Sequence, residues 1–258
     1  IASSSTSSNN ITYVKSNEVT DEHIEEMRDS HWVICNFANL STLNKLSICK
    51  KLDYSIVEYD YKFCRYRSME LHKKTESKPC DCTSQESGKI NLAFYGRAQK
   101  VWFMSDIQRD IVLSHVKTLK REKTSVLSSV FSDGDLKFIN SIKDNKKENK
   151  YLIVKSNSWL KNYGECVEYA KKNKLNYEVV ENVPYHELLI KLSTSKGLIF
   201  LPSGADTCPR LVIEAFMLGC NTILNDLVQH KDEDWFGTPQ KCYEYMSSRA
   251  KEFWSNYE

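Results

Sequence analysis

Short apolar runs alternate with amphipathic segments along the chain, and the alternation is most regular after residue 120. Short apolar runs indicate buried strands, whereas apolar positions that recur every three or four residues indicate helices. In this half the pattern predicts strands at 125–130, 151–154, 177–180, 197–201 and 220–224. It predicts helices at 133–143, 163–173, 185–194, 209–218 and 240–254.

The first half follows the same alternation with more interruptions. The pattern predicts strands at 11–14, 32–36, 54–59 and 101–104. It predicts helices at 21–28, 41–50 and 106–119, the last capped by Ser105. Residues 61–89 are polar, basic and irregular, and we expect a long connection there, which in a compact domain is usually functional or disordered.

Strands that alternate with helices of this length indicate an α/β protein with parallel sheets. The units are too many for one sheet, and the break near 117–125 favours two Rossmann-like domains facing across a cleft, with a short N-terminal domain. We therefore expect a flexible lead-in at 1–10, an N-terminal domain at 11–120 and a C-terminal domain at 121–238. The last helix, within 239–258, is expected to pack back on the N-terminal domain.

Composition excludes several classes of protein. The chain has 258 residues, of which 41% are hydrophobic and 27% charged, as in a globular protein. Its net charge of +2 makes nucleic acid an unexpected partner, although basic residues cluster between 62 and 74. No apolar run is long enough to span a bilayer and no apolar segment opens the sequence, so we expect a cytoplasmic protein.

Nine cysteines are scattered along the chain, several of them in apolar runs. An odd number in this arrangement indicates buried or free thiols in a reducing compartment. Cys80-Asp81-Cys82 has neither the two-residue spacer nor the second pair of a common zinc site, so the sequence predicts no metal.

Two carboxylates flank the predicted start of helix 209–218. Asp206 lies in the preceding loop and Glu214 lies inside the helix, among apolar neighbours where a charge needs a partner. The N-terminus of a helix can bind a phosphate, and carboxylates on either side of it can accept hydrogen bonds from hydroxyl groups. A nucleotide sugar carries both kinds of group, so this arrangement predicts a nucleotide-sugar site. Two structural alternatives remain open: Asp206 as a helix N-cap, and Glu214 as an acid that caps a neighbouring loop.

The segment from 197 to 223 carries a family resemblance. It combines the strand GLIFLPS, the acids at Asp206 and Glu214, and the run AFMLGCNTI that leads into the next strand. In this order and spacing it resembles the retaining glycosyltransferases of the B-type fold, the class that includes glycogen synthase and sucrose synthase. The resemblance covers about 125–236 and continues more faintly through 101–130.

The resemblance implies a role for each matching residue. Glu214 would hold the ribose hydroxyls of the nucleotide, and Asp206 would touch the transferred sugar. Lys155, or Lys161, would contact phosphate. The backbone of Val183, Pro184 and Tyr185 would read the base, and the diphosphate would meet the amides of Thr207 and Cys208. The remaining donor-binding residues are Ser203, Gly204, Ala205 and Arg210.

The chain also departs from the family pattern. Asp206 is one methylene shorter than the usual Glu, and Cys208-Pro209 replaces an aromatic–Gly pair. Pro209 removes one N–H donor but is tolerated in a first helical turn, and Arg210 offers a guanidinium that suits phosphate. No Gly-rich loop occurs near the start of the N-terminal half.

The acceptor is expected in the N-terminal half, where the segment after strand 54–59 mixes acids, bases and aromatic residues. Asp60 and His72 are candidates to deprotonate the acceptor hydroxyl. A solvated loop is the alternative, and in the family the departing phosphate often takes the proton. The candidate acceptor-binding residues are Tyr61, Lys62, Arg65 and Arg67.

The sequence thus predicts a glycosyltransferase that moves a sugar from a UDP- or GDP-linked donor to a glycan or other hydroxyl acceptor. The resemblance implies retention of configuration, and preorganised amides and cations allow transfer with no metal and no cofactor. Two alternatives stay open: a non-catalytic module that binds nucleotide sugars, and a nucleotide-sugar epimerase on the same scaffold.

Overall fold

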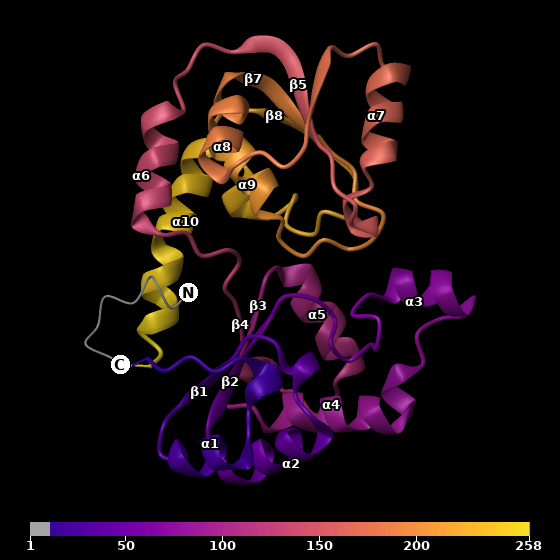
Figure 1. Ribbon diagram of the computed structural model, residues 1–258, viewed down its shortest axis with the longest axis vertical. Helices are drawn as coiled ribbons and strands as arrows, with labels where there is room; N and C mark the ends of the chain where they lie inside the picture. The colour runs from indigo at the N-terminus through magenta and orange to yellow at the C-terminus, as the bar shows by residue number, and fades with distance from the viewer. Residues whose placement is uncertain (1–10, 258) are drawn as a thin grey trace. The chain divides into compact units, whose positions relative to one another are not determined.

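The computed structural model describes residues 11–257, so the lead-in predicted at 1–10 lies outside the described residues. The chain divides into two compact units (Figure 1). The first runs to Ser128 and includes Tyr257, and the second spans Ser129–Asn256. The boundary therefore follows Ser128 rather than residue 120, because β4 and the turn after it complete the first sheet.

The N-terminal unit is a four-stranded parallel sheet in the order β1-β2-β3-β4. Its strands are β1 (Trp32–Ile34), β2 (Tyr54–Glu58), β3 (Lys100–Phe103) and β4 (Thr124–Val126). Its helices are α1 (Asp21–Glu26), α2 (Thr42–Lys51), α3 (Met69–Glu76), α4 (Glu86–Arg97) and α5 (Asp106–His115). Its short 3₁₀ turns are η2 (Ser16–Glu18), η3 (Phe37–Asn39), η4 (Cys82–Ser84) and η5 (Arg121–Lys123).

The C-terminal unit is a second parallel sheet, in the order β6-β5-β7-β8. Its strands are β5 (Glu148–Val154), β6 (Tyr177–Val180), β7 (Ser195–Phe200) and β8 (Asn221–Leu224). Its helices are α6 (Asp133–Ile142), α7 (Tyr163–Lys172), α8 (Tyr185–Thr194), α9 (Arg210–Met217) and α10 (Pro239–Trp254), with 3₁₀ turns η6 (Trp159–Lys161) and η7 (Asp234–Phe236).

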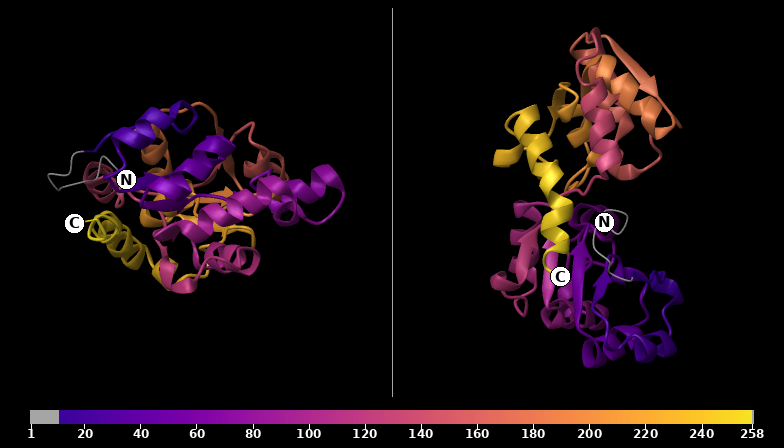
Figure 2. Two further views of the ribbon diagram at one scale, coloured as in Figure 1. Left: turned by 90° about the horizontal axis from the view of Figure 1, so that it is seen from below. Right: turned by 90° about the vertical axis from the view of Figure 1, so that its left-hand side faces the viewer.

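Helices cover both faces of the second sheet, because its central strands are apolar on both sides. Leu152, Leu198 and Phe200 pack into the larger core with residues of α6, α8, α9 and α10. The alternate positions Ile153 and Ile199 face the other way, into a smaller core with residues of α7. Helix α10, drawn in yellow in Figure 2, packs against α9 and α6 of this unit.

The C-terminal helix α10 contributes to the core of the C-terminal unit. Cys242 and Met246 of α10 are buried in the core of the C-terminal unit, so the helix belongs with that unit. Only the chain beyond it joins the N-terminal unit, where Trp102 donates a hydrogen bond of 2.8 Å from its indole N–H to the hydroxyl of Tyr257.

Three segments of the N-terminal unit also differ from the prediction. Residues 11–14 form no strand. The connection predicted at 61–89 contains α3, η4 and the start of α4. Ser105 caps α5 as predicted, its hydroxyl accepting from the amide of Gln108 at 3.1 Å, but the helix ends at His115. The long connection is therefore largely structured.

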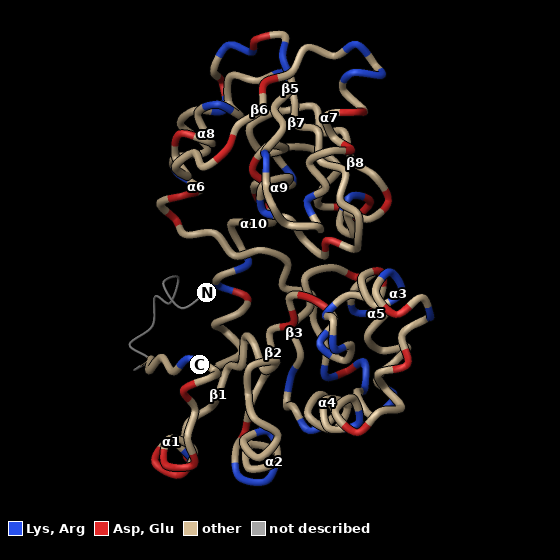
Figure 3. The backbone as a smooth tube through the Cα atoms, turned by 45° about the vertical axis from the view of Figure 1, so that its right-hand side comes forward, with Lys and Arg blue, Asp and Glu red and all other residues tan. Residues whose placement is uncertain are grey.

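Surface charge is mixed rather than segregated by sign. Acidic residues gather on α1 and basic residues at the end of α2 (Figure 3), where Lys51 pairs with Glu25. Within residues 11–257, no helix combines the length and the apolar character needed to cross a membrane.

Candidate functional site

The order of the second sheet marks where a ligand is expected. The chain passes from β5 to β6 on one side and then returns to β7 on the other side of β5. In open parallel sheets such a reversal opens a crevice beyond the carboxyl ends of the two strands, and ligands bind there. The segments that leave β5 and β7 carry the predicted donor residues at 155–161 and 203–206.

Lys161 and Asp206 meet at this edge. The ammonium of Lys161 lies 2.8 Å from Oδ2 of Asp206 and 4.9 Å from the ring centroid of Phe200. The side chain of Asp206 is only 11% exposed, so its carboxylate depends on this partner. The structure thus joins two of the predicted donor residues as one ion pair.

The loop after β7 is held by η6. Ser203 donates from its amide to the carbonyl of Leu160 at 3.0 Å and from its hydroxyl to the carbonyl of Trp159. Gly204 packs under the indole of Trp159, where a Cβ would lie 2.5 Å from the nearest ring atom. Only glycine allows this approach, and the approach fixes Lys161 on η6 against the loop that carries Asp206.

Asp206 is not a helix cap. Helix α9 begins at Arg210 after Pro209, and no side chain of the described residues caps it. The backbone of Asp206 instead pairs with the segment around Val228, accepting from the amide of Gln229 at 3.1 Å. The carboxylate is therefore held by tertiary contacts, and the N-cap alternative for Asp206 is excluded.

Glu214 lies in a second cluster of predicted donor residues. Its Oε1 accepts from the hydroxyl of Tyr185 at 2.9 Å and lies 3.3 Å from Nε of Arg210, one helical turn earlier. Arg210 also donates to the hydroxyl of Tyr185 at 3.2 Å. Burial raises the pKa of the Glu214 carboxyl, and the Arg210 guanidinium offsets part of that rise.

Glu214 is 3% exposed, whereas the Arg210 side chain above it is 44% exposed. The guanidinium stacks 4.3 Å from the ring centroid of Phe131 and lies 3.7 Å from the carboxylate of Asp135 on α6. Arg210 therefore covers the acid but reaches solvent itself. Any hydroxyl that binds Glu214 must share the carboxylate with Arg210 and Tyr185 or move the guanidinium aside.

The other donor candidates have separate surroundings. Lys155 is exposed and pairs with Glu181 at 2.7 Å, so its ammonium joins neither cluster. Thr207 is buried, and the backbone of Cys208 accepts from the hydroxyl of Ser129 at 3.4 Å. The remaining candidates lie at the surface or partly buried: Val183, Pro184 and Ala205.

The predicted acceptor residues form a network at the end of β2. Lys62 is buried and its ammonium lies 2.7 Å from Glu58 and 3.2 Å from Asp60. Arg67, which has a left-handed backbone at φ 57°, pairs with Asp60. Burial raises the pKa of Glu58, with the ammonium of Lys62 opposing the rise. Tyr61 is buried beside this network, so its ring presents no face to solvent.

A pocket of about 210 Å³ opens beside this network, entirely within the N-terminal unit. Three predicted residues line it, namely Lys62, Arg65 and Arg67. Lys45 of α2 lines it as well, its ammonium 2.9 Å from Oδ1 of Asn91. No carboxylate pairs with Lys45 among the described residues, which leaves the pocket with an unbalanced positive charge.

His72 does not join the pocket. Its side chain is fully buried, with Nδ1 3.6 Å from Sγ of Cys64 and 3.5 Å from Sγ of Cys82. An imidazole enclosed by thiols has no path to an acceptor hydroxyl. Its position therefore favours a structural role over the acceptor-base role predicted from sequence.

Sequence reasoning missed several residues of these clusters. In the sequence, Lys45 cannot be told from an ordinary surface lysine of an amphipathic helix. Trp159 and Asp135 belong to no recognisable motif. Cys64 and His72 carried a usable signal, because with Cys80 and Cys82 they place three cysteines and a histidine within 19 residues of one polar segment.

No family model matches the chain, and no curated protein sequence matches it. Solved structures match its fold. A UDP-forming α,α-trehalose-phosphate synthase from Burkholderia xenovorans superposes with a TM-score of 0.53 at 10% identity, over 90% of this chain and 72% of that one. HepE of Anabaena, in complex with UDP, gives 0.52 at 11% identity, over 90% and 77%.

TarM of S. aureus, in a complex that contains UDP, gives a TM-score of 0.50 at 10% identity. The match covers 92% of this chain but 55% of TarM. At these identities the likeness concerns the fold alone. The chain has the fold of the B-type glycosyltransferases, and the predicted α/β class with two Rossmann-like domains is confirmed.

Proposed function

We propose that this protein transfers a sugar from a nucleoside-diphosphate sugar to a hydroxyl acceptor. The observation that supports the proposal most strongly is the position of Asp206 and Lys161 at the strand reversal of the second sheet. A ligand at such an edge meets both a carboxylate for sugar hydroxyls and an ammonium for phosphate. The fold neighbours HepE and TarM were both solved in complexes with UDP, which agrees with this donor class, and UDP or GDP is the proposed nucleotide.

The diphosphate would bind at the start of α9. The amides of the first helical turn and the partial positive charge of the helix attract an anion. Arg210 and Lys161 add two cations. As the glycosidic bond breaks, negative charge grows on the leaving diphosphate, and these preorganised groups stabilise it in the transition state.

Glu214 would hold the ribose hydroxyls in this proposal. The carboxylate now accepts from Tyr185 and Arg210, so nucleotide binding exchanges these partners for ribose hydroxyls. Arg210 would turn away from Glu214 toward the diphosphate, which its exposed position allows. The same arginine would then serve as a cover in the free protein and as a phosphate ligand in the complex.

The proposed transfer retains the configuration of the anomeric carbon and needs no divalent metal at the diphosphate. The cations named above replace the charge that a metal would supply. The acceptor would bind the basic pocket of the N-terminal unit, where Lys45 and Arg65 favour an anionic glycan or other anionic alcohol.

The test is a thermal-shift panel of nucleoside diphosphates and nucleotide sugars, followed by turnover assays without added Mg²⁺ or Mn²⁺. A ligand present at 100 times its Kd stabilises the folded state by about 2.7 kcal/mol, so a true donor raises the melting temperature clearly. Glu214→Gln, which keeps the shape of the buried side chain, should lose most of that shift. Glu187→Gln on the exposed face of α8 is the matched control.

If no nucleotide at millimolar concentration stabilises the protein, the donor site is refuted. One alternative has specific support, since Glu214 is covered and Asp206 is already paired: a module that binds nucleotide sugars without turning them over. Binding without hydrolysis or transfer would favour that module. Conversion of a nucleotide sugar into its epimer in acceptor-free buffer would favour the epimerase alternative.

A further inference from the structure

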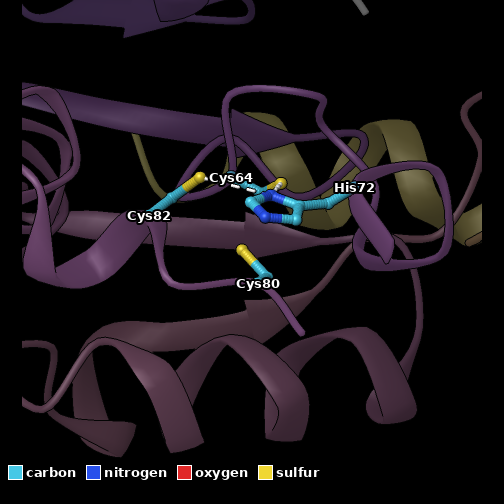
Figure 4. A group of neighbouring side chains, drawn as sticks. All are labelled: Cys64, His72, Cys80 and Cys82. Atoms are coloured by element: carbon cyan, nitrogen blue, oxygen red, sulfur yellow. Dashed lines mark hydrogen bonds between the residues drawn. The ribbon is translucent and has the colours of Figure 1, made fainter. Parts of the chain in front are cut away.

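Four metal-binding side chains converge in the connection after β2. Cys64, His72, Cys80 and Cys82 follow the spacing Cys-x7-His-x7-Cys-x-Cys. Each offers one ligand atom, and these four atoms all lie within 4.8 Å of one another. Figure 4 shows the three cysteine side chains directed toward the imidazole of His72. The fold thus brings together side chains from a segment in which the first and last ligand, Cys64 and Cys82, are 18 positions apart.

The distances match those of a tetrahedral site. With Zn–S bonds of about 2.3 Å and a Zn–N bond of about 2.05 Å, tetrahedral geometry separates the sulfur and nitrogen ligands by about 3.6 Å. Nδ1 of His72 lies 3.6 Å from Sγ of Cys64 and 3.5 Å from Sγ of Cys82. These two separations are those of a zinc site. Since all four ligand atoms lie within 4.8 Å of one another, small side-chain movements bring the sulfurs to the mutual separation of about 3.8 Å that tetrahedral zinc requires.

We propose that Cys64, His72, Cys80 and Cys82 bind one structural Zn²⁺ ion. Three thiolates and one imidazole form a ligand set that zinc takes in closed tetrahedral sites. All nine cysteines of the chain are free, so no disulfide competes for these three sulfurs. With four protein ligands no position stays open for a water or a substrate, so the ion has no catalytic role.

Surrounding groups orient the ligands. With Nδ1 on the metal, the ring N–H of His72 is at Nε2. This buried atom has no hydrogen bond among residues 11–257, and Oδ1 of Asp81 lies 3.7 Å from it. A carboxylate beyond a metal-bound imidazole fixes its tautomer and orientation. The amide of Arg65 donates to Sγ of Cys82 at 3.4 Å, as a backbone N–H does toward a thiolate.

The ligands come from separate short segments of the connection after β2. His72 lies on α3, whose first turn is capped by Ser68, and Cys82 begins η4. Helix α4 approaches this turn so closely that a Cβ on Gly88 would lie 1.7 Å from the carbonyl oxygen of Cys82. A metal cross-link explains how a polar, basic connection adopts a defined structure.

The site also bears on the proposed acceptor pocket, and this step rests on the proposed function. Cys64 and Cys82 line that pocket together with Lys62, Arg65 and Arg67. Zinc would therefore hold the pocket wall while the donor residues, in the other unit, work without a metal. The zinc site itself does not depend on the activity and is tested separately from it.

Metal content of the full chain, expressed with zinc in the medium and purified without chelator, is the first test. We expect about one zinc per chain and little iron or copper. Cys64→Ser, Cys80→Ser and His72→Ala should each fall below about 0.3 zinc per chain. Cys35→Ser, an exposed cysteine of the same unit, is the matched control and should keep its zinc. Stoichiometric zinc in all three ligand variants would overturn the proposal, as would iron in place of zinc.

A second measurement covers variants that fail to fold. Wild-type protein unfolded with chelator and refolded with Co²⁺ should show the visible absorption of a tetrahedral thiolate site, and Zn²⁺ should displace it. Thiol titration of the folded protein should show three more reactive cysteines after chelation than before. An absent cobalt spectrum, or unchanged thiol reactivity, would overturn the assignment. Neither readout involves nucleotide binding, so a failed donor site would leave both unaffected.

Discussion

The ammonium of Lys161 lies 2.8 Å from the carboxylate of Asp206, although the two residues are 45 positions apart in sequence. Lys161 is carried by η6 after β5, and Asp206 by the loop after β7. The pair therefore bridges the two strands between which the order of the sheet reverses. It is the contact on which the proposed donor site depends.

Breaking this pair should cost stability, because it leaves a carboxylate of low exposure without its cation. We expect Lys161→Met to lower the free energy of unfolding by about 1–3 kcal/mol in urea denaturation. Asp206→Asn in the same background should recover part of that loss. Lys155→Met removes the exposed partner of Glu181 and should cost at most about 0.5 kcal/mol. Equal costs for the two lysine variants would contradict the assigned role of Lys161.

Gly204 should tolerate no side chain. A Cβ there would lie 2.5 Å from the indole of Trp159, so Gly204→Ala must displace η6 or the loop. We expect a loss of about 1–3 kcal/mol in stability, with a larger fractional loss of transfer because Lys161 moves with η6. Gly164→Ala on α7 is the control: its Cβ meets nothing within 4 Å, and removing a helical glycine should stabilise by about 0.5–1 kcal/mol.

Lys45 should bind an anionic acceptor. It is 8% exposed, hydrogen-bonds Asn91, and burial lowers its pKa, so it gains from a negatively charged ligand. Lys45→Met should raise KM for the acceptor about tenfold or more and leave hydrolysis of the donor in acceptor-free buffer unchanged. Lys50→Met, on the exposed face of the same helix, should change neither constant. An unaltered acceptor KM in Lys45→Met would remove the acceptor from this pocket.

His230 should make the free energy of unfolding decrease at acidic pH. The ring is fully buried, both nitrogens lack partners among the described residues, and burial lowers its pKa to about 3. The unfolded chain protonates this histidine near pH 6.5 and the folded chain near pH 3. The free energy of unfolding therefore has its full value above pH 6.5 and falls as the pH drops from 6.5 toward 3.

Between pH 7 and pH 5 this histidine alone should therefore remove about 2 kcal/mol of unfolding free energy. His230→Phe, which preserves the stack on Trp235, should flatten that part of the pH profile. His186→Phe changes an exposed histidine and should leave the profile as in the wild type. Matching slopes in wild type and His230→Phe would count against a neutral buried imidazole.

Local patterns predicted much of the regular structure because burial and helix capping act over a few residues. The range 177–180 matches β6 and 185–194 matches α8, and Ser105 caps α5 as expected. The prediction failed in 61–89, where α3 and the start of α4 lie in a polar segment with little apolar periodicity. There the backbone is organised by contacts to distant residues, such as the approach of Gly88 to Cys82.

The sequence by itself determined the fold class, since strands buried on two faces and amphipathic helices in alternation permit few arrangements other than covered parallel sheets. It also marked Glu214, because an acid inside an apolar helix stands out, and Asp206, because it lies in the loop before that helix. Only the tertiary structure decided which side chains they meet: Lys161 for the first, Arg210 and Tyr185 for the second. The tertiary structure also decided that His72 lies beside Cys64, Cys80 and Cys82. The path of the folded chain, and not the spacing in sequence, brings their four ligand atoms within 4.8 Å of one another.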